Sequence, residues 1–305
     1  MKYVLKIILL LLGVATCKAS IIDEVISLAK KHSYKSDSIN WEQAKQTITQ
    51  RCANKEVNTQ CVLNNLLTVI NDQHSFIATS SKNSSCEIGD SFQPNGWLEQ
   101  KIAYIEIPSL MCGDPVKQNL YIRTHLKLIA ELDSQEPEYW VIDLRGNRGG
   151  HMWPMLSVAS VFLNTQTAGY AIKNNQKMFG WWAKEGEVGV YQNTHAGQFT
   201  AIDIKKPVVV LINKETGSAA EATAISFIGR EQTLIAGKQS KGLATMNQPF
   251  NLSDGSRLML ATAYFASRNL DTFPDGVTPD ISVEINDQKE VINFAKSAWE
   301  NVFSK

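Results

Sequence analysis

The chain lacks an excess of charge of either sign, since 30 Lys and Arg residues balance 30 Asp and Glu residues. If residues 1–19 are removed as a leader, the chain loses three basic residues and becomes slightly acidic. Nothing in this balance favours binding to nucleic acid. Internal repeats and low-complexity tracts are also missing, which argues against a solenoid or a long disordered linker.

The sequence also lacks the usual patterns for metals and nucleotide cofactors. None of the five cysteines is separated from another by two residues, the spacing typical of structural zinc sites. The glycine-rich run over 146–150 does not have the spacing of a phosphate-binding loop. We therefore expect neither a metal ion nor an organic cofactor.

No apolar run reaches the roughly 20 residues that a transmembrane helix needs. The run over 7–12 follows two lysines, and small residues around Cys17 suit a cleavage site. We therefore expect residues 1–19 to be a secretory signal and the protein to be secreted or periplasmic, without stable membrane insertion. A lipoprotein cleavage box ending at Cys17 is the alternative, but Thr16 fits that pattern poorly.

The rest of the chain keeps four cysteines, Cys52, Cys61, Cys86 and Cys112. An even number of cysteines in an exported protein favours disulfides. Three pairings are open at this point, and the one that joins Cys52 to Cys61 and Cys86 to Cys112 closes the shortest loops.

Length and composition allow one large domain and a small one, because 305 residues with 44% hydrophobic content can bury a sizeable core. From 20 to 82, apolar residues recur at helical spacing, which predicts a small lobe of three helices. From 83 to 300, apolar strands alternate with helical segments, which predicts an α/β domain with a covered sheet. The aromatic-rich segment 166–198 fits this alternation poorly and is interpreted as an insertion or a mobile flap.

The candidate nucleophile follows a continuously apolar strand predicted over 208–212. The segment KETGSAAE then leads into a helix, so the backbone of Ser218 is held at the exit of a buried strand. The amide of the next residue, Ala219, is placed to stabilise an oxyanion. Another predicted strand, 140–144, runs into the glycine-rich loop 145–150, whose bare amides can approach a ligand closely.

The order of these motifs resembles the C-terminal-processing, or tail-specific, serine peptidases. The motifs are a strand over 104–110, VIDLRGNRGG over 141–150, the segment around Ser218, and DGVTPDI over 275–281. The resemblance extends over roughly residues 72–283. It implies an α/β fold with a crotonase- and Clp-protease-like core.

The same resemblance implies roles for individual residues. Ser218 would be the nucleophile, and the backbone amide of Ala219, with that of Gly149 or Gly150, would form the oxyanion hole. The enzyme would cleave a peptide or protein substrate through an acyl-enzyme.

The residue at the general-base position differs from that in the serine–lysine branch of this family. When the glycines of 237–242 are aligned with that branch, Leu243 stands at the lysine and Asn247 at the glutamine that orients the lysine. A tricorn-like branch instead uses a histidine in an Asp-x-His-Ser segment, which here is residues 72–75. The resemblance to that branch implies that His74 accepts the serine proton near neutral pH.

Two other residues compete with this base. Lys241 lies two positions before the lysine site of the serine–lysine branch, and His151 directly follows the glycine loop. His32, His125 and His195 have no comparable context and are expected at the surface.

The third catalytic residue would differ from that of the tricorn-like branch. The tricorn-like branch has a glutamate shortly before its Gly-Val-x-Pro-Asp end, whereas residues 270–276 contain none. Asp271 is the candidate replacement, with Ser75 as a relay between Asp271 and His74.

Substrate selection is expected to come from the cleft. About thirty residues separate His74 from Tyr104, too few for a peptide-reading PDZ domain of about ninety residues. His151, Met152 and Trp153, with the aromatic residues of 166–198, are the candidate substrate-binding residues.

Two other functions stay open. A catalytically silent member of the fold would bind peptides or small molecules; the absent lysine and glutamate favour it, and the presence of both Ser218 and His74 argues against it. An acyl-CoA enzyme of the related crotonase fold has no use for a serine at this position or for a secretory signal.

Overall fold

The computed structural model describes residues 21–53, 58–78, 86, 88–190, 193–195, 202–203 and 205–303. The expected signal sequence and Cys17 therefore lie outside the described residues. The chain divides into two compact units. We call residues 1–82 with 245–263 the N-terminal unit, and residues 83–244 with 264–305 the main unit.

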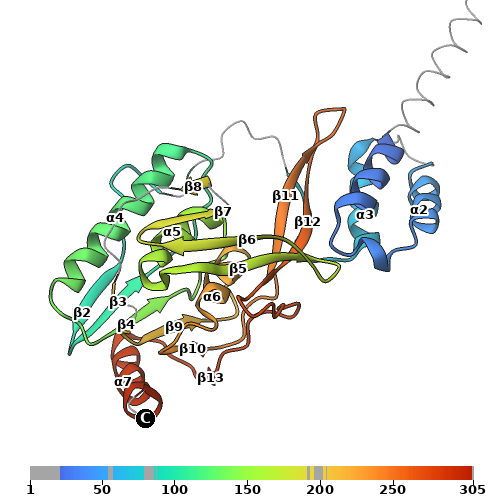
Figure 1. The fold of residues 1–305 in the computed structure, drawn as a ribbon. Helices are drawn as coiled ribbons and strands as arrows, with labels where there is room; N and C mark the ends of the chain where they lie inside the picture. The colour runs from blue at the N-terminus through green and yellow to red at the C-terminus, as the bar shows by residue number, and fades with distance from the viewer. Residues whose placement is uncertain are drawn as a thin grey trace, which may run out of the picture. The chain divides into compact units, whose positions relative to one another are not determined.

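Helices predominate in the N-terminal unit, as the apolar spacing predicted (Figure 1). Its elements are a helix over 21–32, the 3-10 turn η1 (Ser36–Ser38), α2 (Trp41–Ala53), α3 (Thr59–Ile70), the strands β1 (Phe76–Ala78) and β11 (Thr245–Asn251), and the first part of β12 (Arg257–Ala266). Asn71 ends α3 in a left-handed conformation, and the turn that follows carries His74 toward β1.

Residues 245–263 belong to this unit because they supply part of its core. β1 pairs with β12 in antiparallel register, with Phe76 opposite Met259. Leu252, Leu258 and Leu260 are buried in the same apolar cluster as the helices. The sequence order alone had placed this hairpin in the second domain, since strand pairing across 180 residues leaves no local signal.

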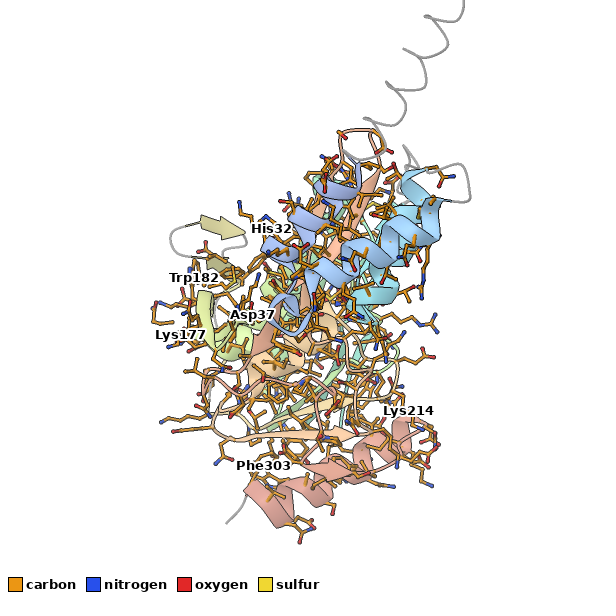
Figure 2. All side chains as sticks on the ribbon, turned by 90° about the vertical axis from the view of Figure 1, so that its right-hand side faces the viewer. His32, Asp37, Lys177, Trp182, Lys214 and Phe303 are labelled. Atoms are coloured by element: carbon orange, nitrogen blue, oxygen red, sulfur yellow. A yellow bond between two sulfur atoms is a disulfide. The ribbon has the colours of Figure 1, made fainter. Side chains whose placement is uncertain are left out.

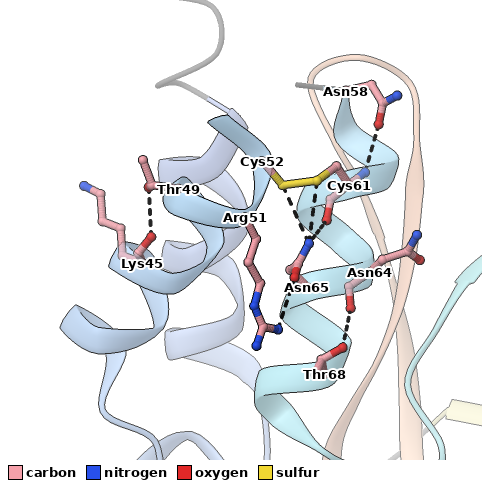
Figure 3. The surroundings of a disulfide bond; sticks show 9 residues. All are labelled: Lys45, Thr49, Arg51, Cys52, Asn58, Cys61, Asn64, Asn65 and Thr68. Carbon is pink, nitrogen blue, oxygen red and sulfur yellow. Dashed lines mark hydrogen bonds between the residues drawn. A yellow bond between two sulfur atoms is a disulfide. The ribbon is translucent and has the colours of Figure 1, made fainter. Parts of the chain in front are cut away.

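A disulfide between Cys52 and Cys61 joins the end of α2 to the start of α3 (Figure 3). The amide of Asn65 donates to the carbonyl of Cys61 at 2.9 Å and lies beside both sulfurs (Figure 3). The second disulfide joins Cys86 to Cys112 in the main unit. Of the three pairings open in the sequence, the structure has the one with the shortest loops.

The main unit is built on a six-stranded sheet in the order β13-β10-β9-β4-β3-β2. Its strands are β2 (Gly96–Glu99), β3 (Ile102–Glu106), β4 (Tyr139–Asp143), β9 (Val208–Ile212), β10 (Thr233–Gly237) and β13 (Ile281–Ser282). All neighbours pair in parallel except β2, which is antiparallel to β3. The carboxyl ends of β3, β4, β9 and β10 therefore meet at one edge, where ligands bind in open α/β sheets.

Helices cover both faces of this sheet, as the continuously apolar strands predicted. α4 (Pro115–Asp133) contacts β2 and β3, α6 (Ala219–Phe227) contacts β9, and α5 (Met152–Leu163) packs against α4 and α6 (Figure 1). On the opposite face α7 (Gln288–Ala298) buries Val291, Ile292 and Ala295 against the sheet.

The described residues of the segment 166–198 belong to a second, antiparallel sheet, which corrects the interpretation of this segment as an insertion or flap. β5 (Thr165–Lys173), β6 (Gln176–Lys184), β7 (Glu187–Val190) and β8 (Asn193–His195) follow one another as a meander. The indole of Trp181 is buried and donates to Ser226 Oγ on α6 at 3.1 Å, while Lys177 and Trp182 lie on the same strand (Figure 2). Aromatic residues among polar ones reflect a sheet with one buried face.

None of the helices within the described ranges combines the length and apolar character that crossing a membrane would require.

Candidate active site

Ser218 lies between β9 and α6, at the N-terminal end of the helix. Its backbone has φ 55° and ψ −117°, a conformation that costs a residue with a side chain about 1–3 kcal/mol. Two hydrogen bonds hold the turn to the end of β4. Thr216 Oγ1 donates to the carbonyl of Leu144 at 2.8 Å, and Gly217 N donates to the carbonyl of Asn147 at 3.0 Å. The hydroxyl-bearing residue is thus fixed in a strained turn, and it is only partly buried.

A single carboxylate organises the backbone around this serine. Glu221 is fully buried and accepts four hydrogen bonds. One oxygen accepts from the amides of Ser218 (2.8 Å) and Leu243 (2.9 Å), and the other from Ser240 Oγ (2.6 Å) and the amide of Gly242 (2.9 Å). Burial raises the pKa of Glu221, and the four donated bonds oppose this rise.

Val277, in the Gly-Val-x-Pro-Asp motif, is connected to the carboxylate of Glu221 through Ser240. The amide of Val277 donates to Ser240 Oγ at 2.7 Å, and the amide of Ser240 donates to the carbonyl of Val277 at 3.1 Å. Motifs separated by some sixty residues along the chain are therefore parts of one bonded cluster around Glu221.

The glycine loop packs directly on the serine turn. A side chain at Gly149 would come within 2.8 Å of Ser218 Cβ and 3.0 Å of Ala219 N, which only glycine avoids. Gly150 has φ +123°, and a side chain there would overlap the carbonyl of Leu110. The loop leaves no room for any residue larger than glycine at either position.

The amides of this loop differ in what they bond. Gly149 N donates to Asn147 Oδ1 at 2.8 Å, so its proton is engaged. The amides of Gly150 and Ala219 have no acceptor among the residues that the structure describes. Of the two glycines that the sequence left open, Gly150 is thus the one whose amide can bond an oxyanion alongside Ala219.

Asn147 is the scaffold of the loop, a role that the sequence did not reveal. It is buried, its Nδ2 donates to the carbonyl of Ile107 at 2.7 Å, and its Oδ1 accepts from Gly149 and from Ser109 Oγ. An asparagine among glycines is typical of turns, so the residue type alone does not identify such a role.

An ion pair between partly buried Arg145 and buried Asp143 supports the loop at the end of β4. Arg145 donates from Nε and Nη2 to Asp143, and Tyr104 donates its hydroxyl to Asp143 Oδ2 at 2.8 Å. Burial, together with the negative charge of Asp143, raises the pKa of Tyr104 well above its ordinary value, which keeps the phenol protonated as a donor.

His74 lies in the N-terminal unit, on the turn between α3 and β1. Its amide donates to Asp72 Oδ1 at 2.9 Å, and Ser75 donates from both its amide and its hydroxyl to Asp72. The ring nitrogen Nδ1 is 2.7 Å from Thr245 Oγ1, and Asn247 Nδ2 donates to the carbonyl of His74 at 2.7 Å. The ring and both backbone polar groups of His74 therefore have defined partners.

Ser75, the expected relay between Asp271 and His74, bonds to other residues in this structure. The hydroxyl of Ser75 donates to Asp72 Oδ2 and accepts from the amide of Ala261. Asp271, in the main unit, is exposed and accepts from Ser267 Oγ at 3.1 Å. Asp271 as the third member stays a prediction.

The rival bases lie in the main unit. Lys241 is exposed, and its amide donates to the carbonyl of Thr216 at 2.8 Å. Leu243, at the lysine position of the serine–lysine branch, bonds Glu221 through its amide.

The candidate substrate-binding residues begin α5. His151 stands at the N-cap, with Nδ1 3.2 Å from Gln118 Nε2, and Met152 and Trp153 follow in the first turn, each partly buried. The amide of His151 donates to the carbonyl of Leu110 at 2.9 Å. This bond anchors the start of α5 directly after the glycine loop.

His125 is buried, which corrects the expectation that it lies at the surface. Its side chain is fully buried on α4, where Nδ1 lies 2.7 Å from the carbonyl of Tyr121 and Nε2 3.2 Å from that of Glu106. Burial lowers the pKa of His125 to about 4. His32 is half-buried beside Phe250, and the side chain of His195 lies outside the described residues.

Comparisons with known proteins identify the family and the fold. The model of peptidase family S41 matches residues 101–283. A nisin-resistance protein of Lactococcus lactis is 27% identical over 270 residues, which cover 86% of this chain and 82% of that protein. A carboxyl-terminal-processing protease of Synechocystis is 28% identical over 54% of this chain, and the chain spans about a third of that relative's length.

Solved structures show the same fold. A lipoprotein from Streptococcus agalactiae superposes with a TM-score of 0.67 at 20% identity, covering 92% of this chain and 96% of that one. The photosystem II D1 C-terminal processing protease superposes with a TM-score of 0.66 at 13% identity, covering 90% and 96%. The predicted α/β fold with N-terminal helices is thereby confirmed. With the family model spanning more than half of the sequence, the chain belongs to peptidase family S41 and is a serine-type peptidase.

Proposed function

We propose that Ser218 cleaves peptide bonds through an acyl-enzyme and that His74 is its general base. The observation that carries the proposal is the serine turn itself. A strained, partly exposed serine stands beside the amides of Ala219 and Gly150, which have no acceptor in the described part of the chain. This is the geometry that acyl transfer needs around a developing oxyanion.

In the first half of the reaction, Ser218 Oγ bonds to the carbonyl carbon while its proton passes to Nε2 of His74. The carbonyl oxygen becomes an oxyanion that accepts hydrogen bonds from the amides of Ala219 and Gly150. The imidazolium then gives the proton to the leaving nitrogen as the carbon–nitrogen bond breaks, and an ester remains on Ser218.

In the second half, water replaces the departed amine. His74 takes a proton from that water, the water oxygen attacks the ester carbon, and the proton returns to Ser218 Oγ as the ester bond breaks. The N-terminal end of α6 favours the negative charge in both halves. The sequence suggests Asp271 as a third member, and Asp271→Asn tests by the same assays whether the reaction needs that carboxylate.

The substrates are peptides or the tails of proteins, and we infer that they are met outside the cytoplasm. Two disulfides favour an oxidising compartment, and one structural relative is a lipoprotein. The leader over 1–19 supports export into the periplasm or medium, with lipid attachment at Cys17 as the second option. Because a nisin-resistance protein is among the relatives, nisin is a reasonable first substrate to test.

The deciding experiment is fluorophosphonate labelling of the exported protein, with Ser218→Ala and His74→Ala in parallel. We expect wild type to label, Ser218→Ala to lose all labelling, and His74→Ala to label at least 100-fold more slowly, because general-base catalysis contributes roughly 10²–10⁴-fold. Circular dichroism confirms that the variants are folded, and mass spectrometry identifies products from nisin and from a library of peptide tails.

The other outcomes are equally informative. Labelling at full rate in His74→Ala would contradict the base assignment, and His151→Ala and Lys241→Ala would then be compared. A folded wild type that neither labels nor cleaves any peptide would favour the catalytically silent, peptide-binding alternative.

A further inference from the structure

We propose that Thr245 positions the catalytic imidazole, with Asn247 as a second anchor. In this proposal the two residues orient His74, the role that the sequence suggested for Asp271. The proposal rests on the proposed function, since it concerns the base of that reaction. Its observations lie entirely within the N-terminal unit, where His74, Thr245 and Asn247 all belong.

The first observation is the contact to the ring. Thr245 Oγ1 lies 2.7 Å from His74 Nδ1, and Thr245 is only 6% exposed. A short hydrogen bond from a buried side chain restricts rotation of the imidazole, because turning the ring would break the bond in a place that water reaches poorly.

The second observation is the spacing of the two anchors. Thr245 and Asn247 are two residues apart on β11, so their side chains lie on the same face of the strand. Asn247 Nδ2 donates to the carbonyl of His74 at 2.7 Å, so that one strand face holds both the ring and the backbone of the histidine.

The side-chain oxygen of Asn247 makes no hydrogen bond within the described residues. This atom, Oδ1, is buried. A buried acceptor without a partner destabilises the folded state, so Asn247 stabilises this region through its donor alone. The bond from Nδ2 to the carbonyl of His74 is the one side-chain hydrogen bond of Asn247 within the described residues.

With Nδ1 bonded to Thr245, Nε2 is assigned the role of base in this proposal. For Nε2 to accept the serine proton, the neutral ring must carry its own proton on Nδ1. Thr245 Oγ1 then accepts that proton, and it continues to do so when the ring becomes an imidazolium. A hydroxyl can do this without a negative charge, so the base is oriented by a neutral group where tricorn-like enzymes are expected to use an acid.

The test compares Thr245→Val with Thr245→Ser, with Thr262→Val as the matched control. Valine removes the hydroxyl at nearly constant shape, and serine keeps it. Thr262 is a buried threonine of the same unit, and its Oγ1 donates to the carbonyl of Met246, away from His74. Thermal unfolding of each variant verifies that the fold is intact.

We expect Thr245→Val to lower kcat and the fluorophosphonate labelling rate roughly 10- to 100-fold with KM changed less than about twofold, since part of a 10²–10⁴-fold base contribution is lost. Thr245→Ser should recover most of the rate, and Thr262→Val should behave like wild type. Asn247→Leu should lower kcat by less than Thr245→Val does, because it leaves the ring contact in place.

A spectroscopic readout separates positioning from a general loss of structure. Long-range ¹H–¹⁵N correlations of histidine-labelled Ser218→Ala report which ring nitrogen of His74 is protonated. We expect the Nδ1-protonated tautomer, and a mixture of tautomers when Thr245→Val is added. An Nε2-protonated ring bonded by the threonine hydroxyl would overturn the proposal.

Failure of this proposal is distinguishable from failure of the proposed function. An active wild type with an equally active Thr245→Val would overturn the role of Thr245 and leave Ser218 and His74 in place. A wild type that neither labels nor cleaves would overturn the function, and the positioning role with it.

Discussion

Two turns of this protein, one around Ser218 and one around His74, are each built on a carboxylate, but the two carboxylates differ in burial. Glu221 is fully buried and accepts four hydrogen bonds from residues spread over 218–243. Asp72 is half-buried and accepts three hydrogen bonds, all from His74 and Ser75. The serine turn is therefore held by long-range tertiary bonds, whereas the histidine turn is largely a local structure with two side chains of β11 added.

The largest expected effect comes from replacing each carboxylate by its amide. In Glu221→Gln, whichever oxygen becomes the amide nitrogen then faces two donors, so we expect the free energy of unfolding to fall by roughly 3–5 kcal/mol. In Asp72→Asn the amide nitrogen can face Ser75 Oγ and donate to it, so the loss should be about 1 kcal/mol.

Urea denaturation of both variants measures this difference, with labelling by fluorophosphonate as the second readout. Equal losses of stability in the two variants would contradict the distinction between a buried tertiary anchor and a local one.

A pH effect on stability must be separated from the titration of the base. His125 has a pKa of about 4 in the folded protein against an ordinary value of 6.5, so between these values the unfolded chain binds more protons. The stability that His125 contributes is complete above pH 6.5 and is lost as the pH falls toward 4, by about 3 kcal/mol in total.

His125→Gln should remove this part of the pH dependence, whereas His32→Gln, the control, should keep it. The measurement is the free energy of unfolding of each variant between pH 4 and 7.5. A wild type whose stability changes with pH in parallel with His125→Gln would show that the buried histidine is not responsible. Where the prediction holds, acid losses of activity include unfolding in addition to protonation of His74.

The smallest expected effect tests the strain at the nucleophile. Ser218 has a positive φ, which glycine adopts without a steric cost. We expect Ser218→Gly to be about 1 kcal/mol more stable than Ser218→Ala, with neither variant active. Thermal unfolding compares the two, and a Ser218→Gly protein less stable than Ser218→Ala would contradict the strain.

The sequence predicted much of the frame from local patterns. Apolar runs identified β4 and β9, helical spacing identified the N-terminal helices, and the even cysteine count indicated disulfides. These features depend on residues close together in the chain, so their signal is present in short windows of sequence. The aromatic segment 166–198 was misinterpreted because alternation in a sheet with one buried face resembles irregular structure when its partners are unknown.

The residues of the candidate active site could be predicted from the sequence only in part, for a similar reason. Ser218, Gly149 and Gly150 stand in motifs of recognisable composition, whereas Asn147, Ser240 and Thr245 are ordinary polar residues until their partners are known. His125 was placed at the surface because a histidine on a helix gives no sign of burial when the helix's neighbours are not yet assigned.

By itself, the sequence determined the family resemblance, the order of the central strands and helices and the residue types available for chemistry, because composition and spacing are local properties. The tertiary structure decided which carboxylate holds the nucleophile's backbone, which amides find no acceptor among the described residues, and which strand holds the ring of His74. Those outcomes depend on hydrogen bonds between residues as far apart as 74 and 245, and such pairings are selected only when a buried core brings distant segments together.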